Sequence, residues 1–418
     1  MVTGISNIEV RHANRQNILQ IIRENGMLTK KEISNRLDLS LATVTSLVRE
    51  LIDEGVVEAG EVSDSTGGRK PVMYQAVANA RVSLGISLGH HHIRLVLATW
   101  NQEILKTASE WLPYENTDAY WEKLSAIVRD FLEVEYAEDG GFKGIGICME
   151  AVVVPTAAIR PGTAGVPEMT AAPAAATVSG TTMAPTATGE VIPSGIFAGL
   201  DPSRVQALFP CPVLFYENMK AAAFSQIGAP GHRRRTVYLC LDRRVGGAVV
   251  ADGGFWCLSK RAGAFGEMLM GDGNGARACG DDGASAGGHG AGGSISGALR
   301  GGGSLQDCCS SDVIREQSGF ELADFFERLE MKDEGCVNIW NTYIRNLARA
   351  IHNLRVIFDI DITLGGKMAP YICQRKEPLE EMLSQMDLYG ETVDYLRFSD
   401  GGAMDGASGA AFLTLERV

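Results

Sequence analysis

The stretch "TKKEISNRLDLSLATVTSLVRELIDEG" (residues 29–55) decides the fold of the first part of the chain. Thr29 and Glu32 have the spacing of a capping box, which predicts that a short helix begins at residue 30. Ser40 can cap the next helix, in which apolar residues recur every three or four positions until Gly55 ends it. Two capped helices joined by a tight turn indicate a helix-turn-helix unit.

Another amphipathic helix is predicted upstream, over "NRQNILQIIRENG" (residues 14–26). It would place Ile18, Leu19 and Ile22 on one side and end at Gly26. Three helices with such faces can enclose one small core. In the helix after Ser40, the predicted apolar stripe consists of Val44, Leu47, Val48, Leu51 and Ile52.

The opposite face of that helix carries small polar side chains and one arginine. A rotation of about 100° per residue places Ala42, Thr45, Ser46 and Arg49 opposite the stripe, with Thr43 at its edge. Small side chains let a helix lie deep in the major groove, where Ser, Thr and Arg contact bases and phosphates. The alternative is a small helical bundle with a solvated polar face. The residues predicted to bind DNA here are Ser40, Ala42, Thr43, Thr45, Ser46 and Arg49.

The next segments, "VVEAGEV" and "PVMYQAV", predict the two strands of a β-hairpin with "SDSTGGRK" as its tip. Gly67 and Gly68 remove side chains where a backbone comes close to DNA. Arg69 and Lys70 supply positive charge to a narrow groove. We therefore predict that this hairpin is the wing of a winged helix-turn-helix domain and that these four residues contact DNA.

The composition indicates a folded chain of two or three domains, with 418 residues and a hydrophobic fraction of 45%. No apolar run approaches the ~20 residues that cross a membrane, and the N-terminus lacks the apolar core of a signal peptide. Nine cysteines without a CxxC pair indicate reduced thiols. We expect a cytoplasmic protein with no membrane partner.

The net charge of −13 by itself argues against a nucleic-acid-binding protein. Residues 1–80, however, hold nine Lys or Arg and ten Asp or Glu, so their net charge is −1 and the remainder carries −12. Salt screens the two parts from each other beyond ~10 Å. A local basic face on residues 1–80 is compatible with this charge distribution.

After residue 80, strand and helix patterns alternate, which indicates an α/β body. The segments "LGISLG", "GIGI", "YEN", "VGGAVVADG", "GAFGE", "ACGDDG" and "LGG" follow in this order. After a winged helix-turn-helix, this order resembles the ROK family of sugar-responsive repressors and sugar kinases, and "GGRKP" in the wing is similar to its repressor branch. The resemblance implies two lobes of the actin-like, ribonuclease H-type fold with a sugar-sized cleft between them.

The resemblance also implies a division of the chain. We expect the winged helix-turn-helix DNA-binding domain at residues 1–80 and the first lobe at residues 81–200. The second lobe, with a dimerisation surface, is expected at residues 201–395. Residues 396–418 would form a C-terminal helix that returns to the first lobe.

Positions that serve catalysis in the family's kinases are changed in this chain. Ser87, Gly89, His90 and His91 correspond to the turn that holds ATP phosphate, and Asp-Arg-Arg at residues 242–244 corresponds to a second glycine-rich turn. Bulky side chains therefore stand where backbone N–H groups would hold a phosphate.

Met219 occupies the place of the aspartate that removes a proton from the sugar hydroxyl in these kinases. A general base must accept a proton, and a thioether cannot do so. We expect no catalytic residue, no cofactor and no kinase activity.

Two residues match sugar contacts of the family, Asn218 in "YEN" and Glu267 in "GAFGE". Amide and carboxylate groups suit pairs of hydroxyls, so both are predicted to bind the ligand. The alternative is that Asn218 only caps the following helix and that Glu267 is solvated. The Pro-Gly that follows "GIGI" in the family is replaced by Glu150 and Ala151.

The zinc knuckle of the family retains one of its four ligands. Tetrahedral zinc requires about four N or S donors, so no metal is expected. His289, Cys308 and Cys309, or the histidines at 90 and 92, are the alternative ligands. The matched knuckle positions are Met270, Arg277, Cys279 and Ala284.

Two segments, residues 151–195 and 271–304, are dominated by small residues and predict mobile loops. The whole pattern indicates a transcriptional regulator, most simply a repressor, that binds double-stranded operator DNA as a homodimer or tetramer. Its body would respond to a sugar or sugar phosphate. The alternatives are a sugar kinase and a constitutive repressor without an effector.

Overall fold

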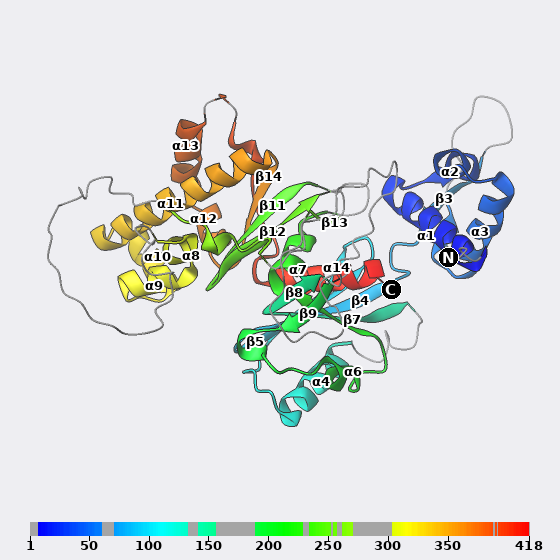
Figure 1. Cartoon of the computed structure of the whole chain (residues 1–418), viewed down its shortest axis with the longest axis horizontal. Coiled ribbons are helices and arrows are strands. Elements are labelled where there is room, and N and C mark those ends of the chain that lie inside the picture. Colours follow the sequence, from blue (N-terminus) through cyan, green and yellow to red (C-terminus); the bar gives the residue numbers. More distant parts are fainter. Residues whose placement is uncertain are drawn as a thin grey trace, which may run out of the picture. The chain divides into compact units, whose positions relative to one another are not determined.

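The chain forms two compact units, each with its own hydrophobic core. The first comprises residues 1–235, 250–260 and 404–418, and the second comprises residues 236–249 and 261–403. The computed structural model (Figure 1) describes residues 7–60, 71–132, 141–155, 189–228, 234–251, 254–256, 261–270, 303–387, 389–390 and 392–417.

The head, residues 7–80, has the predicted winged helix-turn-helix architecture. Its three strands form an antiparallel sheet in the order β1-β3-β2. The short strand β1 was not predicted, and it pairs with the strand that follows the wing tip. The elements are α1 (Asn7–Asn25), β1 (Leu28–Thr29), α2 (Lys30–Leu37), α3 (Leu41–Asp53), β2 (Val57–Ala59) and β3 (Met73–Ala76).

Both predicted caps of the helix-turn-helix are present. The Thr29 hydroxyl accepts a hydrogen bond from the Glu32 N–H at 3.2 Å, and the Glu32 carboxylate accepts one from the Thr29 N–H at 2.8 Å. These bonds hold the pKa of Glu32 below its usual value. The Ser40 hydroxyl accepts from the Thr43 N–H at 3.1 Å and so begins α3. The two caps fix where each helix starts.

The core of the head contains four of the five residues of the predicted apolar stripe. Ile52 is the exception, because it is 37% exposed. One residue beyond Leu51, it is rotated by about 100° away from the core. The prediction was wrong at this position. The other buried members include Ile18, Leu19, Ile22, Leu28 and Ile33.

The first lobe is a five-stranded sheet in the order β10-β7-β4-β5-β6. β4, β7 and β10 are parallel, whereas β5 and β6 return antiparallel. Buried apolar side chains of the sheet and α4 share one core. The elements are β4 (Val82–Leu88), β5 (His92–Thr99), β6 (Ile104–Trp111), α4 (Asp118–Leu132), β7 (Phe142–Met149), η2 (Gly195–Phe197), α6 (Pro202–Gln206), β10 (Val213–Glu217) and α7 (Asn218–Ser225).

The C-terminal helix α14 (Asp405–Arg417) packs on this sheet and on α7, as Figure 1 shows. A Cβ atom at Gly85 would lie 1.8 Å from the carbonyl oxygen of Ala407, and one at Gly146 would lie 2.3 Å from that of Ala410. No real side chain fits at these distances. Glycine in β4 and β7 is therefore required for the helix to approach the sheet.

The segment 151–195 is not entirely a loop. β8 (Ala151–Pro155) and β9 (Gly189–Pro193) form an antiparallel pair in which Ala151 faces Pro193. The β-branched residues at 152–154 and 191–192 favour strand structure, although the composition of the whole segment conceals them. The rest of the predicted loop, residues 156–188, lies outside the described residues.

The second sheet has the order β13-β12-β11-β14-β15, in which β11, β14 and β15 are parallel. Its strands belong to the second unit, except for β13 and the last two residues of β12, which fall within residues 250–260. Helix α11 supplies much of the core of the second unit. The elements are β11 (Thr236–Leu241), β12 (Val245–Ala251), β13 (Gly254–Phe255), η3 (Phe265–Glu267), α8 (Leu305–Cys309), α9 (Ser311–Ser318), α10 (Leu322–Glu330), α11 (Glu334–Phe358), β14 (Asp361–Gly365), α12 (Ala369–Cys373), α13 (Glu377–Met386), η5 (Val393–Tyr395), β15 (Leu396–Phe398) and η6 (Gly402–Met404).

Two of the expected domain boundaries differ from this division. Residues 201–235 belong with the first lobe because β10 pairs with β7 in its sheet. Residues 396–403 belong to the second unit because β15 pairs with β14. The returning C-terminal helix is therefore shorter than the expected 396–418.

Seven cysteines lie in the described part of the chain, and all carry free thiols. Burial raises the pKa of Cys148 to about 12, so its thiol stays protonated. No described helix is both long and apolar enough to cross a membrane.

We expect Ser40→Ala to lower the free energy of unfolding of the head by about 1 kcal/mol, because the Thr43 N–H loses its acceptor. Urea denaturation followed by circular dichroism measures this change. Ser109→Ala is the matched control, because Ser109 is an exposed residue of β6. Equal midpoints for the two variants would contradict the assigned cap.

Candidate nucleic-acid interface and sugar site

The face of α3 that points away from the core carries the predicted DNA-contact residues. Ala42, Thr45, Ser46 and Arg49 are exposed, and Thr43 is half-buried. Val44, Leu47, Val48 and Leu51 are fully buried on the other face. Ser40 is exposed as well, but its hydroxyl already caps the helix and lies 2.8 Å from the Thr43 hydroxyl. Arg49 is the one long cationic side chain among these predicted contact residues.

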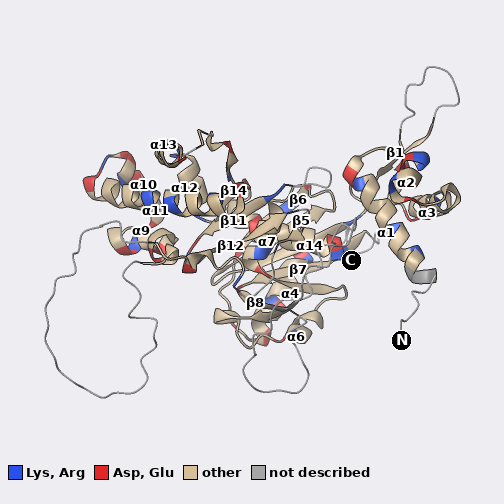
Figure 2. Cartoon of the chain, turned by 45° about the horizontal axis from the view of Figure 1, so that its top comes forward, with Lys and Arg blue, Asp and Glu red and all other residues tan. Residues whose placement is uncertain are grey.

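Two charged residues that sequence reasoning missed lie beside this face. Arg11 of α1 forms an ion pair with Glu50 of α3, and its guanidinium lies 3.4 Å from the Ser46 hydroxyl. The Ser46 hydroxyl lies 3.3 Å from the Glu50 carboxylate. The only sequence signal was the spacing of four residues between Ser46 and Glu50, and nothing indicated that Arg11 comes close. Figure 2 shows such cations and carboxylates interspersed over the helices of the head.

The wing residues Gly67, Gly68, Arg69 and Lys70 lie outside the described residues. The base of the hairpin is described, and Val57 pairs with Ala76 and Ala59 with Tyr74. The Gly60 N–H donates to the Met73 carbonyl at 2.8 Å, which extends this pairing toward the tip.

In the body, Asn218 and Met219 begin α7 directly after β10. The cap of this helix is Glu217, whose carboxylate accepts from the N–H groups of Met219 at 3.0 Å and Lys220 at 2.9 Å. Asn218 is half-buried, and its side-chain oxygen also lies 3.0 Å from the Met219 N–H. The alternative for Asn218 was a role as helix cap. Glu217 makes two of the capping hydrogen bonds, and Asn218 contributes one.

The turn after β4, which corresponds to the kinases' first phosphate turn, is closed by its own backbone. The Gly89 N–H donates to the His92 carbonyl at 3.0 Å. The carbonyls of His90 and His91 accept from the segment after β6. The exposed rings of His91 and His92 pack on Trp111, with centroids 5.3 and 4.7 Å from its ring. The turn is therefore occupied by imidazoles and indole.

The second turn, between β11 and β12, is tied to its surroundings by charge pairs. The Asp242 carboxylate lies 3.3 Å from the Lys367 ammonium, and the Arg243 guanidinium lies 3.2 Å from the Asp312 carboxylate. The side chain of Gln306 accepts from the Val245 N–H and donates to the Arg243 carbonyl. The side chains of Asp242 and Arg243 in this turn are therefore both engaged in ion pairs.

Glu267 is exposed in the short helix η3 of the second unit. Met270, at the position of the zinc-ligating histidine, is only 4% exposed and packs in the core of that unit. Arg277, Cys279, Ala284 and His289 lie outside the described residues. The described residues contain no group of three or more His, Cys, Asp or Glu that could hold a metal ion.

Two family models match the chain. A model described as winged helix-turn-helix DNA-binding matches residues 11–58, and the ROK family model matches residues 199–417, just over half of the chain.

Curated relatives match about a quarter to a third of the chain's length. The chain is 33% identical over 96 residues to the xylose repressor of Caldicellulosiruptor bescii, which is 23% of this chain and 24% of that protein. It is 28% identical over 145 residues to the xylose repressor of Bacillus subtilis, which is 34% of this chain and 38% of that protein. The matched stretches therefore span well under half of these relatives.

Solved structures share the fold over a greater length. A ROK family transcriptional regulator, a homologue of the E. coli Mlc protein, has a TM-score of 0.63 at 16% identity and covers 97% of both chains. A ROK hexokinase from Thermus thermophilus has a TM-score of 0.53 at 17% identity, covering 79% of this chain and 98% of that chain. The family model, together with the head and the two sheets, leads to one conclusion: this chain belongs to the ROK family.

Proposed function

We propose that the chain is a sequence-specific DNA-binding transcriptional regulator that acts as a repressor. The exposed face of α3 carries this proposal, because small polar side chains and Arg49 stand where a recognition helix meets base edges. The match of residues 11–58 to a winged helix-turn-helix DNA-binding model supports it. Such a regulator acts where the genomic DNA is, in the cytoplasm.

A homodimer is the simplest assembly for this function. Two heads related by a twofold axis contact two half-sites about one helical turn of DNA apart, or a multiple of it. Sequence-specific affinity then depends on how the body spaces the heads. A ligand alters repression only if it prefers one arrangement of the body over the other.

We further propose that the ligand is a sugar or sugar phosphate, bound by Asn218 and Glu267. The names of two relatives, both xylose repressors, support a pentose as the first candidate. The half-buried amide of Asn218 and the exposed carboxylate of Glu267 are able to exchange hydrogen bonds with hydroxyls.

The body would bind its ligand without phosphorylating it. Met219 provides no proton acceptor at the start of α7, and Asp242 places a carboxylate in the second phosphate turn. The similarity to a hexokinase, at 17% identity, concerns the fold alone.

Arg49→Ala is expected to weaken binding to the specific operator by about 1–3 kcal/mol, because a base or phosphate contact is lost. Gel-shift titration at fixed salt, on genomic fragments selected by the whole chain, measures the loss. The control is Arg345→Ala, which removes an exposed arginine of α11 in the second unit. If the two variants bind alike, the proposed orientation of α3 on DNA is incorrect.

Met219→Asp is expected to leave the chain without kinase activity, because the turn at Asp242 still lacks a phosphate cradle. A coupled assay of ADP release with ATP and a panel of pentoses and hexoses tests both the unmodified chain and the variant. Sugar-dependent turnover by the unmodified chain would refute the non-enzymatic proposal.

The cognate sugar is expected to stabilise the chain by about 2.7 kcal/mol at 100 times its dissociation constant. Thermal unfolding with xylose, N-acetylglucosamine and glucose measures the shift. Asn218→Ala and Glu267→Ala should each abolish it, whereas Asn338→Ala, an exposed change on α11, should not. A chain that no sugar or sugar phosphate stabilises would instead be a constitutive repressor.

A further inference from the structure

A tryptophan and two arginines meet where the head joins the first lobe. Trp100, in the turn after β5, is 2% exposed. The guanidinium carbon of Arg23, near the end of α1, lies 4.9 Å from its ring centroid, and that of Arg81, just before β4, lies 5.5 Å away. Arg23 also donates to the Trp100 carbonyl, and the indole N–H donates to the Val77 carbonyl at 2.9 Å. The indole therefore brings two cations close together.

Carboxylates only partly balance this positive charge. Arg23 lies 3.5 Å from Glu416 of α14, and Arg15 pairs with Glu54. Arg81 pairs with no carboxylate in the part of the chain that the structure describes, and its Nε atom is buried without a hydrogen-bond partner. Burial lowers the pKa of Arg81, and the nearby Arg15 and Arg23 lower it further. An unpaired, half-buried cation is costly unless an anion approaches it.

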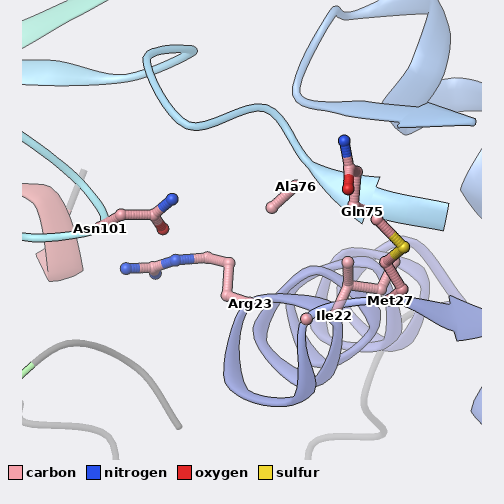
Figure 3. A pocket seen from close by; sticks show the side chains of 7 residues that line it. Ile22, Arg23, Met27, Gln75, Ala76 and Asn101 are labelled. Carbon is pink, nitrogen blue, oxygen red and sulfur yellow. The ribbon is translucent and has the colours of Figure 1, made fainter. Parts of the chain in front are cut away.

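A pocket of about 270 Å³ opens beside these cations. Figure 3 shows the Arg23 side chain extending along it toward Asn101, with Met27 and Gln75 at the other end. The Asn101 amide makes no hydrogen bond to any described residue, whereas the Gln75 amide donates to Glu58 at 2.8 Å. The remaining walls come from Ile22, Gly26 and Ala76. The pocket thus offers a cation and an amide at one end, and the Met27 side chain with the Gln75 amide at the other.

We propose that this junction pocket binds a small organic anion, whose phosphate or carboxylate group is held by Arg23 and Asn101. Arg81, whose guanidinium carbon lies 5.5 Å from the indole centroid, adds a positive charge that favours any anion in the pocket. A phosphate or carboxylate matches the fork of donors on a guanidinium. This site is separate from the sugar site at Asn218, and it does not depend on that proposal.

A ligand in this pocket contacts residues of both the head and the first lobe. Ile22, Arg23 and Ala76 belong to the head, whereas Asn101 belongs to the first lobe. An anion bound there stabilises the arrangement in which the two are in contact. It therefore changes DNA binding to the extent that this arrangement and the DNA-bound one differ.

The test uses the whole chain with inorganic phosphate and malonate as probes, against sodium chloride at equal ionic strength. We expect a saturable rise in the unfolding temperature and a dissociation constant measurable by calorimetry. Arg23→Gln and Asn101→Ala should each weaken binding about tenfold, since each removes a hydrogen bond to a charged group. Arg81→Gln should weaken it less. Arg345→Gln, on exposed α11, should leave it unchanged.

Asn101→Ala keeps the indole and both arginines in place, so it remains informative if Arg23→Gln fails to fold. The proposal is overturned if neither probe binds the unmodified chain more tightly than chloride, or if Asn101→Ala binds them equally well. It is also overturned if, without added anion, Arg81→Gln weakens DNA binding and flattens its salt dependence, because the cations would then contact the DNA backbone.

Discussion

The close approach of α14 to the first sheet is the contact on which the rest of the first unit depends. Gly85 of β4 and Gly146 of β7 let the helix backbone lie directly on the strands, and the Ser83 hydroxyl donates to the Ala411 carbonyl at 2.7 Å. Gly409 allows the same closeness to α7, where an added Cβ would meet the Ala221 carbonyl oxygen at 1.6 Å. A side chain larger than hydrogen at any of these glycines would separate the helix from its support.

That helix also joins the head to the first lobe. Leu415 packs in the hydrophobic core of the head together with Trp100, and Glu416 lies 3.5 Å from Arg23. The last turn of the chain and the end of α1 therefore share one cluster, although nearly 400 residues separate them in sequence. A shift of α14 on the sheet would move groups that the head itself packs against, which gives the body a direct physical route to the DNA-binding helices.

The structure of the head could be predicted well because the residues that specify each of its helices lie next to that helix in the sequence. The capping box of Thr29, the cap at Ser40, the glycine stops and the apolar stripe of α3 all lie within a few residues of the structure that they specify. The ion pair of Arg11 with Glu50 and the packing of Arg23 and Arg81 on Trp100 join residues 19 to 77 positions apart. No periodicity encodes such pairs. The β8–β9 hairpin was missed because composition averages over a long segment, whereas strand formation depends on a few β-branched residues.

The changes to the kinase positions are of three physical kinds. Met219 removes a proton acceptor, Asp242 and Arg243 replace a flexible turn by charge pairs, and Met270 fills the place of a metal ligand with apolar core. Each replacement is stable by itself, since the charges at the turn are paired and the methionine is buried. Met219 and Asp242 lie at a helix start and in a turn rather than in the packed sheets, so residues at these positions can change without altering the two cores of the body.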